Sequence, residues 1–484
     1  MSEHTGPITP LDAASVEAWD LETDVAVVGL GIAGTCAAIS ASEAGARVLA
    51  FERAGGPGGT SALSGGLIYL GGGTPIQEAL GFHDTPENME RFLLAACGPD
   101  ADADKVRAYC QGSVAHYHWL VDHGVPFKAE FCDEPNREPV TEAGLCFSGG
   151  EDSWPFNGIA EVVPRGHHPQ FPDTAGGFIM ERLSEALRAT AAQVHTDARV
   201  ERLVVERGRV VGIVVRLDGR DVTVRATGGV VLAAGGFIFN EEMVAEHCPD
   251  AGRPFPAWRV GQDNDDGRGI RLGQGAGGAS TRMGSFECAL PIGPPHRMAR
   301  NILVGRDGRR FINEDTYTGR IGHEALAGRG GDVFMIVSEA TFEVNFVGMR
   351  IGWAAETPEE LAADIGVAPD ALAATISAYN AGAERGEDPE WHKEPEFLVP
   401  LRPPLGAIDL RVDSKAIYAT FTLGGLRTDP TSRVLDEHGA PVPGLYAAGR
   451  TTAGIAAHGY VSGISLGDGS FFGRMAGESA ARGR

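Results

Sequence analysis

The sequence has few cysteines, few basic side chains and no long hydrophobic run. Its seven cysteines in 484 residues are scattered and form no C-x-x-C pair, so neither a zinc site nor a disulfide framework is indicated. Lys and Arg number 41 against 65 Asp and Glu, a net charge of −24, which argues against nucleic-acid and anionic-membrane partners. The polar N-terminus lacks the features of a signal peptide, and no apolar run is long enough to span a bilayer. These absences predict a soluble, cytoplasmic protein.

Glycine, in contrast, is abundant, with 68 residues. Because glycine lets a backbone approach a ligand closely, clusters at both ends of the chain predict one site assembled from distant segments. The clusters lie at 29–34, 55–73, 228–236, 261–278, 424–425 and 444–473.

A segment near the N-terminus has the pattern of a dinucleotide-binding unit. An apolar strand at 25–28 is followed by a glycine-rich turn, an alanine-rich helix and a second strand at 48–51, which ends at Glu52. Glu52 stands where an acidic side chain accepts hydrogen bonds from a ribose. The order and spacing of these parts predict that the chain binds a dinucleotide.

The glycines of this turn, Gly29, Gly31 and Gly34, form a G-x-G-x-x-G motif. The first glycine of such a motif permits the tight turn, and the second lets the pyrophosphate approach the backbone. The third lets the helix pack closely on the strand, and the phosphates lie at the helix N-terminus.

Three further blocks indicate which dinucleotide is bound. They are "PGGTSALSGG" at 57–66, "GGVVLAAGGF" at 228–237 and "VPGLYAAGR" at 442–450. Together with the glycine motif, they resemble the flavoprotein family of fumarate reductases and 3-ketosteroid dehydrogenases, which bind FAD. The resemblance covers nearly the whole chain and implies that FAD is the cofactor.

The resemblance also implies which segments contact FAD. The glycine motif would lie along the flavin and pyrophosphate, the strand around Val200 would touch the adenine end, and the helix after the last block would close on the isoalloxazine ring. The motif and the resemblance together imply a set of FAD-contacting residues: Gly29, Gly31, Ile32, Ala33, Gly34, Glu52, Arg53, Thr60, Ser61, Gly65, Gly66, Val200, Ala234, Gly235, Gly236, Gly449, Arg450, Ser465 and Leu466.

Two departures from the family narrow the expected function. Members that bind flavin covalently carry a histidine in the block at 57–66, which has none here, so we expect non-covalent FAD. Members that reduce fumarate carry a proton-donating arginine in an H-G-x-x-R context, whereas residues 458–462 read "HGYVS". The sequence therefore argues against a fumarate reductase or an aspartate oxidase.

The sequence predicts an α/β fold (α+β overall), in which a Rossmann-like FAD-binding domain carries an inserted α+β catalytic and substrate-binding lobe. We expect the FAD-binding domain to combine 20–285 with 405–484, the lobe to cover 286–404, and residues 1–19 to form an N-terminal extension. Within the lobe, Thr357 is the expected N-cap of the first of two amphipathic helices.

The adjacent His167 and His168 lie in a stretch rich in glycine, proline and aromatic residues. No third ligand stands at a useful spacing from them, so the sequence predicts no metal site. Its loop-like composition predicts that both histidines lie on a loop surface.

The stretch "HGYVSGISLGDGSFFGR" at 458–474 combines hydroxyl side chains with the expected start of the last helix. N–H groups at a helix N-terminus stabilise negative charge that develops on a nearby flavin. Taking a hydride from the β carbon of a ketone also requires a donor for the enolate oxygen and a base for the α proton. Neutral hydroxyls suit an apolar pocket, and Tyr460, Ser462 and Tyr317 are the candidates.

Four segments narrow the resemblance to a subgroup: "GGGTPIQEALGF", "DTYTGRIG", "FTLGGLRTD" and "GYVSGISLGDGSFFGR". They are similar to segments of the 3-ketosteroid Δ4-(5α)-dehydrogenases, which implies that Tyr317, Tyr460 and Ser462 are catalytic. Tyr460 and an N–H near Gly463 would hold the steroid C3 carbonyl. Ser462 and Tyr317 would carry away the C4 proton, with either as the immediate base, and the C5 hydride would go to flavin N5. His458 departs from the bulky aromatic residue of the subgroup and is interpreted as a wall residue.

The expected reaction is the desaturation of a 3-keto-5α-steroid to a Δ4-3-ketosteroid, with an external electron acceptor. A Δ1-dehydrogenase is the nearest rival, but that subgroup has a proline- and glycine-rich turn where this chain has Ser462. The residues are also compatible with an ene-ketone reductase that runs the reverse reaction, and with a flavin-carrying binding or redox-sensing protein without turnover.

Overall fold

The computed structural model describes residues 5–133, 141–253, 258–290, 298–343, 349–414 and 416–483. Within these residues a nine-stranded sheet has the order β1-β9-β10-β11-β2-β3-β8, with β22 beside β11 and β21 beside β22. Its strands are β1 (Leu11–Asp12), β2 (Leu21–Val28), β3 (Val48–Phe51), β8 (Gln193–His195), β9 (Arg199–Glu206), β10 (Arg209–Leu217), β11 (Arg220–Leu232), β21 (Arg433–Leu435) and β22 (Pro441–Ala447).

Four parallel strands at the centre of this sheet end at the same level. Val28 pairs with Phe51 on one side and with Leu232 on the other, and Leu232 pairs with Ala447. Each of these residues is the last of its strand. The loops that follow β2, β3, β11 and β22 therefore meet at one edge of the sheet, where open α/β sheets bind their ligands.

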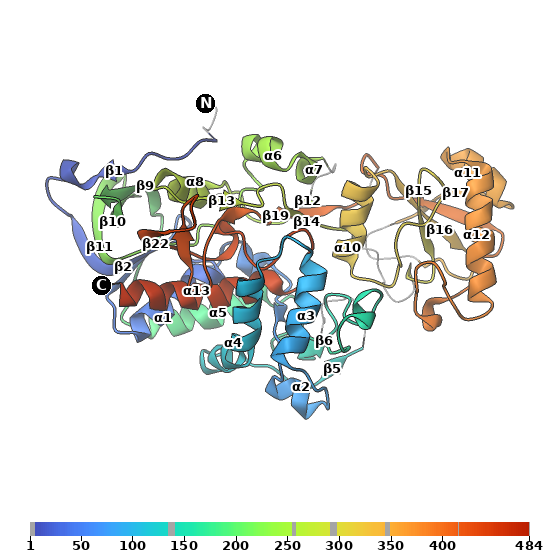
Figure 1. Ribbon diagram of the computed structural model, residues 1–484, viewed down its shortest axis with the longest axis horizontal. Coiled ribbons are helices and arrows are strands. Elements are labelled where there is room, and N and C mark those ends of the chain that lie inside the picture. The colour runs from blue at the N-terminus through green and yellow to red at the C-terminus, as the bar shows by residue number, and fades with distance from the viewer. Residues whose placement is uncertain are drawn as a thin grey trace.

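The helices that cover one face of the sheet are α1 (Ile32–Glu43), α5 (Gly176–Arg188) and α13 (Ile464–Arg482). α13 runs alongside α1 beneath the strands (Figure 1). Two glycines of α13 permit the close approach. A Cβ on Gly473 would lie 2.3 Å from the Ala33 carbonyl oxygen, and one on Gly477 would lie 2.1 Å from that of Ala37.

Smaller sheets and helices surround the ligand edge. One small sheet contains β4 (Ile68–Tyr69), β5 (Phe131–Cys132), β6 (Leu145–Cys146) and β7 (Gly166–His167), near α2 (Pro75–Ala79), α3 (Pro86–Cys97) and α4 (Ala103–Asp122). Another contains β12 (Trp258–Arg259), β14 (Phe286–Ala289) and β19 (Ala419–Thr422), and β13 (Ser280–Thr281) pairs with β20 (Gly425–Leu426). The remaining helices on this side are α6 (Glu241–His247), α7 (Pro249–Gly252) and α8 (Arg268–Gly275).

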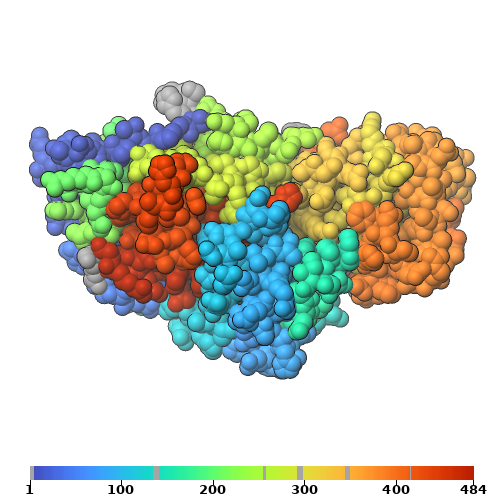
Figure 2. Space-filling model, in the orientation of Figure 1, coloured from blue at the N-terminus to red at the C-terminus, as the bar shows by residue number. Residues whose placement is uncertain are grey.

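A lobe with its own sheet forms one end of the molecule (Figures 1 and 2). The antiparallel order is β15-β16-β18-β17, so β18, which begins at residue 405, pairs within the sheet of the lobe although the predicted boundary assigns it to the FAD-binding domain. The predicted mixed α/β fold class is confirmed, while the division into domains stays a prediction. The elements are β15 (Ile302–Gly305), β16 (Val333–Ser338), β17 (Ile351–Ala355), β18 (Leu405–Asp409), α10 (Thr318–His323), α11 (Pro358–Ile365) and α12 (Pro369–Ala383).

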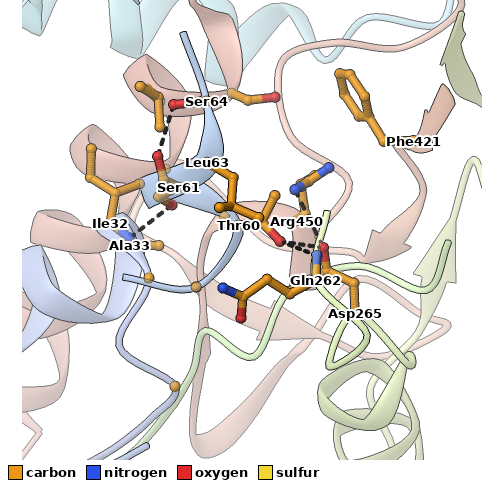
Figure 3. A pocket seen from close by; sticks show the side chains of 18 of the residues that line it. Ile32, Ala33, Thr60, Ser61, Leu63, Ser64, Gln262, Asp265, Phe421 and Arg450 are labelled. Atoms are coloured by element: carbon orange, nitrogen blue, oxygen red, sulfur yellow. Dashed lines mark hydrogen bonds and ion pairs between the residues drawn. The ribbon is translucent and has the colours of Figure 1, made fainter. Parts of the chain in front are cut away.

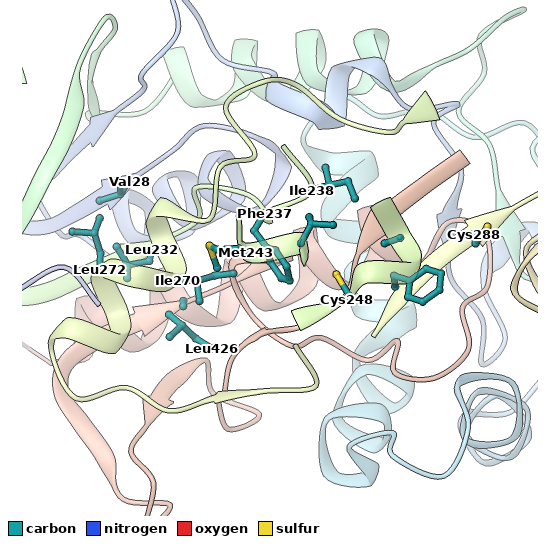
Figure 4. Packing of buried hydrophobic residues seen from close by; sticks show 14 of the residues in the cluster. Val28, Leu232, Phe237, Ile238, Met243, Cys248, Ile270, Leu272, Cys288 and Leu426 are labelled. Atoms are coloured by element: carbon teal, nitrogen blue, oxygen red, sulfur yellow. The ribbon is translucent and has the colours of Figure 1, made fainter. Parts of the chain in front are cut away.

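One buried apolar cluster connects the large sheet with the lobe. Figure 4 shows it extending from Val28 and Leu232 past Phe237 and Met243 to Cys288 in β14. The same cluster includes residues of β15, β16 and β18. Burial of this apolar surface holds the ligand edge and the lobe together.

The structure confirms several local elements that were predicted from the sequence. The strands expected at 25–28 and 48–51 are confirmed as β2 and β3. Thr357 is confirmed as the N-cap of α11, since its hydroxyl accepts a hydrogen bond from the Glu360 N–H at 3.2 Å. All seven cysteines lie in the described residues and are free thiols. Along the part of the chain that is described, no helix has both the length and the apolar character needed to cross a membrane.

The predicted surface position of His167 and His168 is wrong, because both side chains are buried with 0% exposure. His167 belongs to β7, which pairs with β4 and β6. Its Nε2 lies 2.8 Å from the hydroxyl of Thr74, the N-cap of α2. The loop-like composition gave no sign of these strand pairings, which join segments far apart in the sequence.

The contact between α1 and α13 yields a stability prediction. Gly477→Ala places a Cβ against the Ala37 carbonyl, and overpacking of this kind costs about 1–3 kcal/mol. For a chain of this length, we expect the variant to lower the Tm by about 1–3 °C in differential scanning calorimetry. Glu478→Ala on the same helix is the matched control, and we expect it to change the stability by less than about 0.5 kcal/mol. Equal Tm values for both variants would contradict the tight packing.

Candidate active site

A cavity of about 730 Å³ lies at the ligand edge of the large sheet. It is lined by the loops after the four parallel strands, by the start of α13 and by parts of β14 and β19. Most of the residues predicted from the sequence line it: Gly29, Gly31, Ile32, Ala33, Glu52, Arg53, Thr60, Ser61, Gly65, Gly66, Val200, Ala234, Gly235, Gly449, Arg450, Ser465 and Leu466, together with Tyr317, Tyr460, Ser462 and Gly463.

Gly34 and Gly236, which were also predicted to contact FAD, are not among the described residues that line the cavity. A Cβ on Gly34 would lie 1.8 Å from the Gly29 carbonyl oxygen, so this glycine lets α1 pack closely against the turn that precedes it. A Cβ on Gly236 would lie 2.8 Å from the Thr422 hydroxyl. Both glycines therefore lie behind the residues that line the cavity, and their close packing positions those residues.

The turn between β2 and α1 presents backbone to the cavity. Gly29 has φ +90°, and a Cβ there would lie 2.5 Å from the Ala233 carbonyl oxygen, so only glycine fits. Gly31 is the N-cap of α1. The first N–H of the helix, on Ile32, donates to the Ser61 hydroxyl at 3.1 Å (Figure 3). This helix N-terminus and its glycine turn fit the pyrophosphate of a dinucleotide.

The acidic residue at the end of β3 is positioned by backbone N–H groups. One oxygen of Glu52 accepts from the Leu30 N–H at 2.7 Å, and the other accepts from the Ala54 N–H at 2.8 Å. Each carboxylate oxygen has a further lone pair, so Glu52 can also accept hydrogen bonds from ribose hydroxyls. The Val200 carbonyl accepts from Arg268 Nε at 2.7 Å near this end.

Asp265 joins three loops in the middle of the cavity, and the sequence gave no indication of its role. It accepts a hydrogen bond from the Thr60 hydroxyl at 2.7 Å and forms an ion pair with Arg450 at 3.4 Å (Figure 3). The Thr60 hydroxyl in turn accepts from the Gln262 N–H at 3.0 Å. The Arg450 guanidinium lies over the Phe421 ring, 5.0 Å from its centroid. Thr60 and Asp265 are 205 residues apart in the chain, a separation over which local sequence patterns carry no signal.

The hydroxyl groups predicted from the sequence lie at the start of α13. The Tyr460 hydroxyl donates to Ser465 Oγ at 3.1 Å and accepts from the Ser465 N–H at 3.3 Å. Burial raises the pKa of Tyr460 to about 12, so it remains a hydrogen-bond donor at neutral pH. Ser462 is held through its backbone, since its N–H donates to the Ser148 carbonyl at 3.3 Å and its carbonyl accepts from the Ser148 hydroxyl at 3.1 Å.

Gly463 is the N-cap of α13 and has φ +93°. A Cβ at this position would lie 2.8 Å from the Tyr69 nitrogen, whose N–H donates to the Gly463 carbonyl at 3.0 Å. Both the left-handed backbone and the close approach of β4 therefore require glycine.

Glu287 is a cavity-lining residue that was not predicted from the sequence. It is 3% exposed, and its Oε1 accepts a hydrogen bond from the Tyr317 hydroxyl at 3.1 Å. Burial raises the pKa of Glu287 to about 8, although the bond from Tyr317 opposes the shift. The signal was present in the sequence as a single acid inside the otherwise apolar strand "FECA".

The residues present fit FAD. The cavity offers a glycine turn without side chains, a helix N-terminus for phosphate and a carboxylate for a ribose, in the order that the β2-α1-β3 unit requires. The start of α13 lines the same cavity and offers N–H groups to a developing negative charge.

Comparison with known proteins agrees with this geometry. The family model of the FAD binding domain matches residues 24–466. The chain belongs to this family. Within it, the solved structure of a 3-ketosteroid-Δ4-(5α)-dehydrogenase from Rhodococcus jostii RHA1, in complex with 4-androstene-3,17-dione, is 47% identical in sequence. The two superpose with a TM-score of 0.93 over 98% of this chain and 100% of that chain.

Two curated members of the family are also similar along their sequences. The 3-oxo-5-alpha-steroid 4-dehydrogenase of Comamonas testosteroni is 28% identical, over 93% of this chain and 97% of that protein. The NADH:acrylate oxidoreductase of Vibrio harveyi is 28% identical over 97% of this chain, which spans 52% of that protein's length. The predicted resemblance and the predicted cofactor, FAD, are confirmed, while non-covalent attachment and the residue roles stay predictions.

Gly31 lines the cavity without a side chain, and this gives a prediction for cofactor binding. In Gly31→Val the side chain enters the space above the α1 N-terminus, and we expect FAD to bind roughly 30- to 150-fold more weakly, about 2–3 kcal/mol. The measurement is the flavin content of the purified protein by absorbance, with the Kd from titration of the apoprotein. Gly55→Val is the matched control, because nothing lies within 4 Å of a Cβ at that exposed glycine. A fully loaded Gly31→Val protein would refute the assignment.

Proposed function

We propose that this protein is an FAD-dependent 3-ketosteroid dehydrogenase, which introduces a C4–C5 double bond into a 3-keto-5α-steroid to give a Δ4-3-ketosteroid. The observation that carries the proposal is that Tyr317, Tyr460 and Ser462 line one cavity together with the FAD-binding loops. A solved structure 47% identical to this chain is of an enzyme named for that reaction.

The wall of the cavity supports an apolar substrate. Leu63 and Trp258 are 65% and 56% exposed, yet both line the cavity, and Phe421 lines it as well. Large apolar side chains with this much uncovered surface are typical of a binding site for an apolar ligand. A steroid would cover them, whereas the small acids of fumarate-reducing relatives would not.

Tyr460 and Gly463 are suited to hold the C3 carbonyl of such a substrate. The Tyr460 hydroxyl stays protonated because its pKa is raised to about 12. Gly463 begins α13, so its N–H belongs to a helix N-terminus that favours negative charge. Together they stabilise the negative charge that forms on the carbonyl oxygen when the C4 proton leaves.

Ser462 and Tyr317 are suited to carry the C4 proton away. They lie in the same cavity but on different elements, Ser462 before α13 and Tyr317 at the N-cap of α10. When bound, FAD supplies the two-electron acceptor for the oxidation. An external electron acceptor completes the turnover, and the seven free cysteines support a cytoplasmic location.

Product analysis tests this function. Purified protein with FAD is incubated with 5α-androstane-3,17-dione and an artificial electron acceptor, and the position of the new double bond is identified by NMR. We expect a Δ4 product. A Δ1 product would contradict the proposed orientation of the steroid, and a flavin that no saturated 3-ketosteroid bleaches would contradict the substrate class.

The role of Tyr460 yields a separate prediction. Tyr460→Phe should retain FAD and lower kcat by roughly 10²- to 10³-fold, which is the usual effect of removing one oxyanion donor. Tyr379→Phe is the matched control: it removes a buried tyrosine hydroxyl that bonds the Arg300 carbonyl in the lobe, and we expect an unchanged kcat. Steady-state kinetics with 5α-androstane-3,17-dione measure both variants. Near-normal turnover by Tyr460→Phe would exclude it as the oxyanion donor.

A further inference from the structure

Glu287 is a buried acid that faces the reacting end of the cavity. In the small sheet, Glu287 pairs with Phe421 and Ala289 pairs with Ala419, and all four residues line the cavity. Alternate residues of a strand point to the same face, so one face of this sheet forms a cavity wall. Among the apolar side chains of that wall, Glu287 is the group that can gain or lose a proton near neutral pH.

The partner of Glu287 is the hydroxyl of Tyr317, at 3.1 Å. Gly319 makes room for this pair. A Cβ on Gly319 would lie 2.0 Å from Glu287 Oε1 and 2.3 Å from a ring carbon of Tyr317. The "TYTG" segment is therefore shaped so that the phenol and the carboxyl meet.

Burial keeps the titratable groups close to Glu287 neutral near pH 7. They are Tyr460 before α13, Cys97 at the end of α3 and Cys288, the next residue of β14. Burial raises the pKa of Cys97 and of Tyr460 to about 12 and raises that of Cys288 as well. In the described part of the chain, no Lys, Arg or His is among the groups that shift the pKa of Glu287. Its carboxylate therefore has no cation to stabilise it, and it readily takes up a proton.

We propose that Glu287 receives, through Tyr317, the proton that leaves C4 of the substrate; this inference rests on the proposed function. The C4–H bond breaks, and its electron pair remains in the substrate and forms the new double bond. The C5 hydrogen leaves with two electrons to the oxidant of the reaction, the flavin. The proton passes to Tyr317 directly or through Ser462, while the Tyr317 O–H bond breaks and an O–H bond forms on Glu287 Oε1. The carboxylate becomes a neutral acid and returns its proton to water when the product leaves.

The proposal predicts a particular dependence on pH. Only the carboxylate form of Glu287 can accept a proton, and its pKa is about 8. The rate of dehydrogenation should therefore rise with pH up to about 8 and level off above it. Glu287 acts through Tyr317, so a pH profile separates proton uptake from a purely positioning role.

Glu287→Gln is the informative variant, because its amide oxygen can still accept the Tyr317 hydrogen bond but cannot take a proton. We expect unchanged FAD content and steroid Kd, a kcat at pH 9 that is lower by about 100-fold, and loss of the rise around pH 8. Glu287→Asp keeps a titrating carboxyl, and we expect it to keep the rise at a reduced rate. Asp152→Asn is the matched control, since this half-buried acid has a pKa raised to about 7 and lies outside the cavity lining.

A second readout does not depend on turnover. With the flavin reduced under anaerobic conditions, the enzyme cannot oxidise 5α-androstane-3,17-dione, but it can exchange the C4 hydrogen with D2O. Mass spectrometry follows the incorporation of deuterium. We expect rapid exchange with the wild type and with Asp152→Asn, and exchange about 100-fold slower with Glu287→Gln.

The results of these experiments separate the two proposals. A wild-type protein that neither bleaches its flavin nor exchanges C4 hydrogen with this steroid would overturn the proposed function. An active wild type whose Glu287→Gln variant keeps the normal rate, exchange and pH profile would overturn only the role of Glu287. A variant that is slower by the same factor at every pH, with the rise near pH 8 retained, would also overturn proton uptake and leave Glu287 as a positioning residue.

Discussion

The site depends on the register of four parallel strands. Phe51, Val28, Leu232 and Ala447 pair across the sheet and are the last residues of their strands. Because the strands end together, four loops that are separated by up to about 400 residues open on the same edge. A shift of one residue in any pair would reverse the side chains of that strand between the two faces of the sheet, and the loops would no longer meet.

The last helix, α13, fixes the position of the reacting groups relative to these loops. Gly473 and Gly477 let α13 lie against the backbone of α1, which begins at the turn after β2. Gly463, Ser462 and Tyr460 come directly before or at the start of the same helix. The position of α13 along α1 therefore determines where the hydroxyls lie relative to the FAD turn. A helix with larger residues at these contacts would stand further from α1 and carry the hydroxyls away.

Local patterns in the sequence predicted those parts of the site that depend on neighbours in the chain. The β2-α1-β3 unit, with Gly29 and Glu52, follows from spacing within about 30 residues, and family motifs located the hydroxyls. Local patterns could not predict the roles of Asp265 and Glu287, because each bonds a residue that the fold brings close, Thr60 or Tyr317; for Glu287 the sequence showed only a single acid in an apolar strand. The burial of His167 was missed for the same physical reason, because short strands pair over long distances in the sequence.

Burial keeps the titratable groups near the reacting end of the cavity neutral, whereas the protein as a whole is strongly acidic. The chain has a net charge of −24, yet burial raises the pKa of Tyr460 in the cavity wall, and of Cys97 and Cys288 behind it, so these groups remain neutral. A neutral wall accepts an apolar substrate without the large cost of burying unpaired charge. Under the proposed function, the negative charge that develops during the reaction lies on a carbonyl oxygen held by Tyr460 and the N-terminus of α13. The C4 proton would then move by way of Tyr317 to Glu287, a buried carboxyl for which the described residues offer no ion-pair partner.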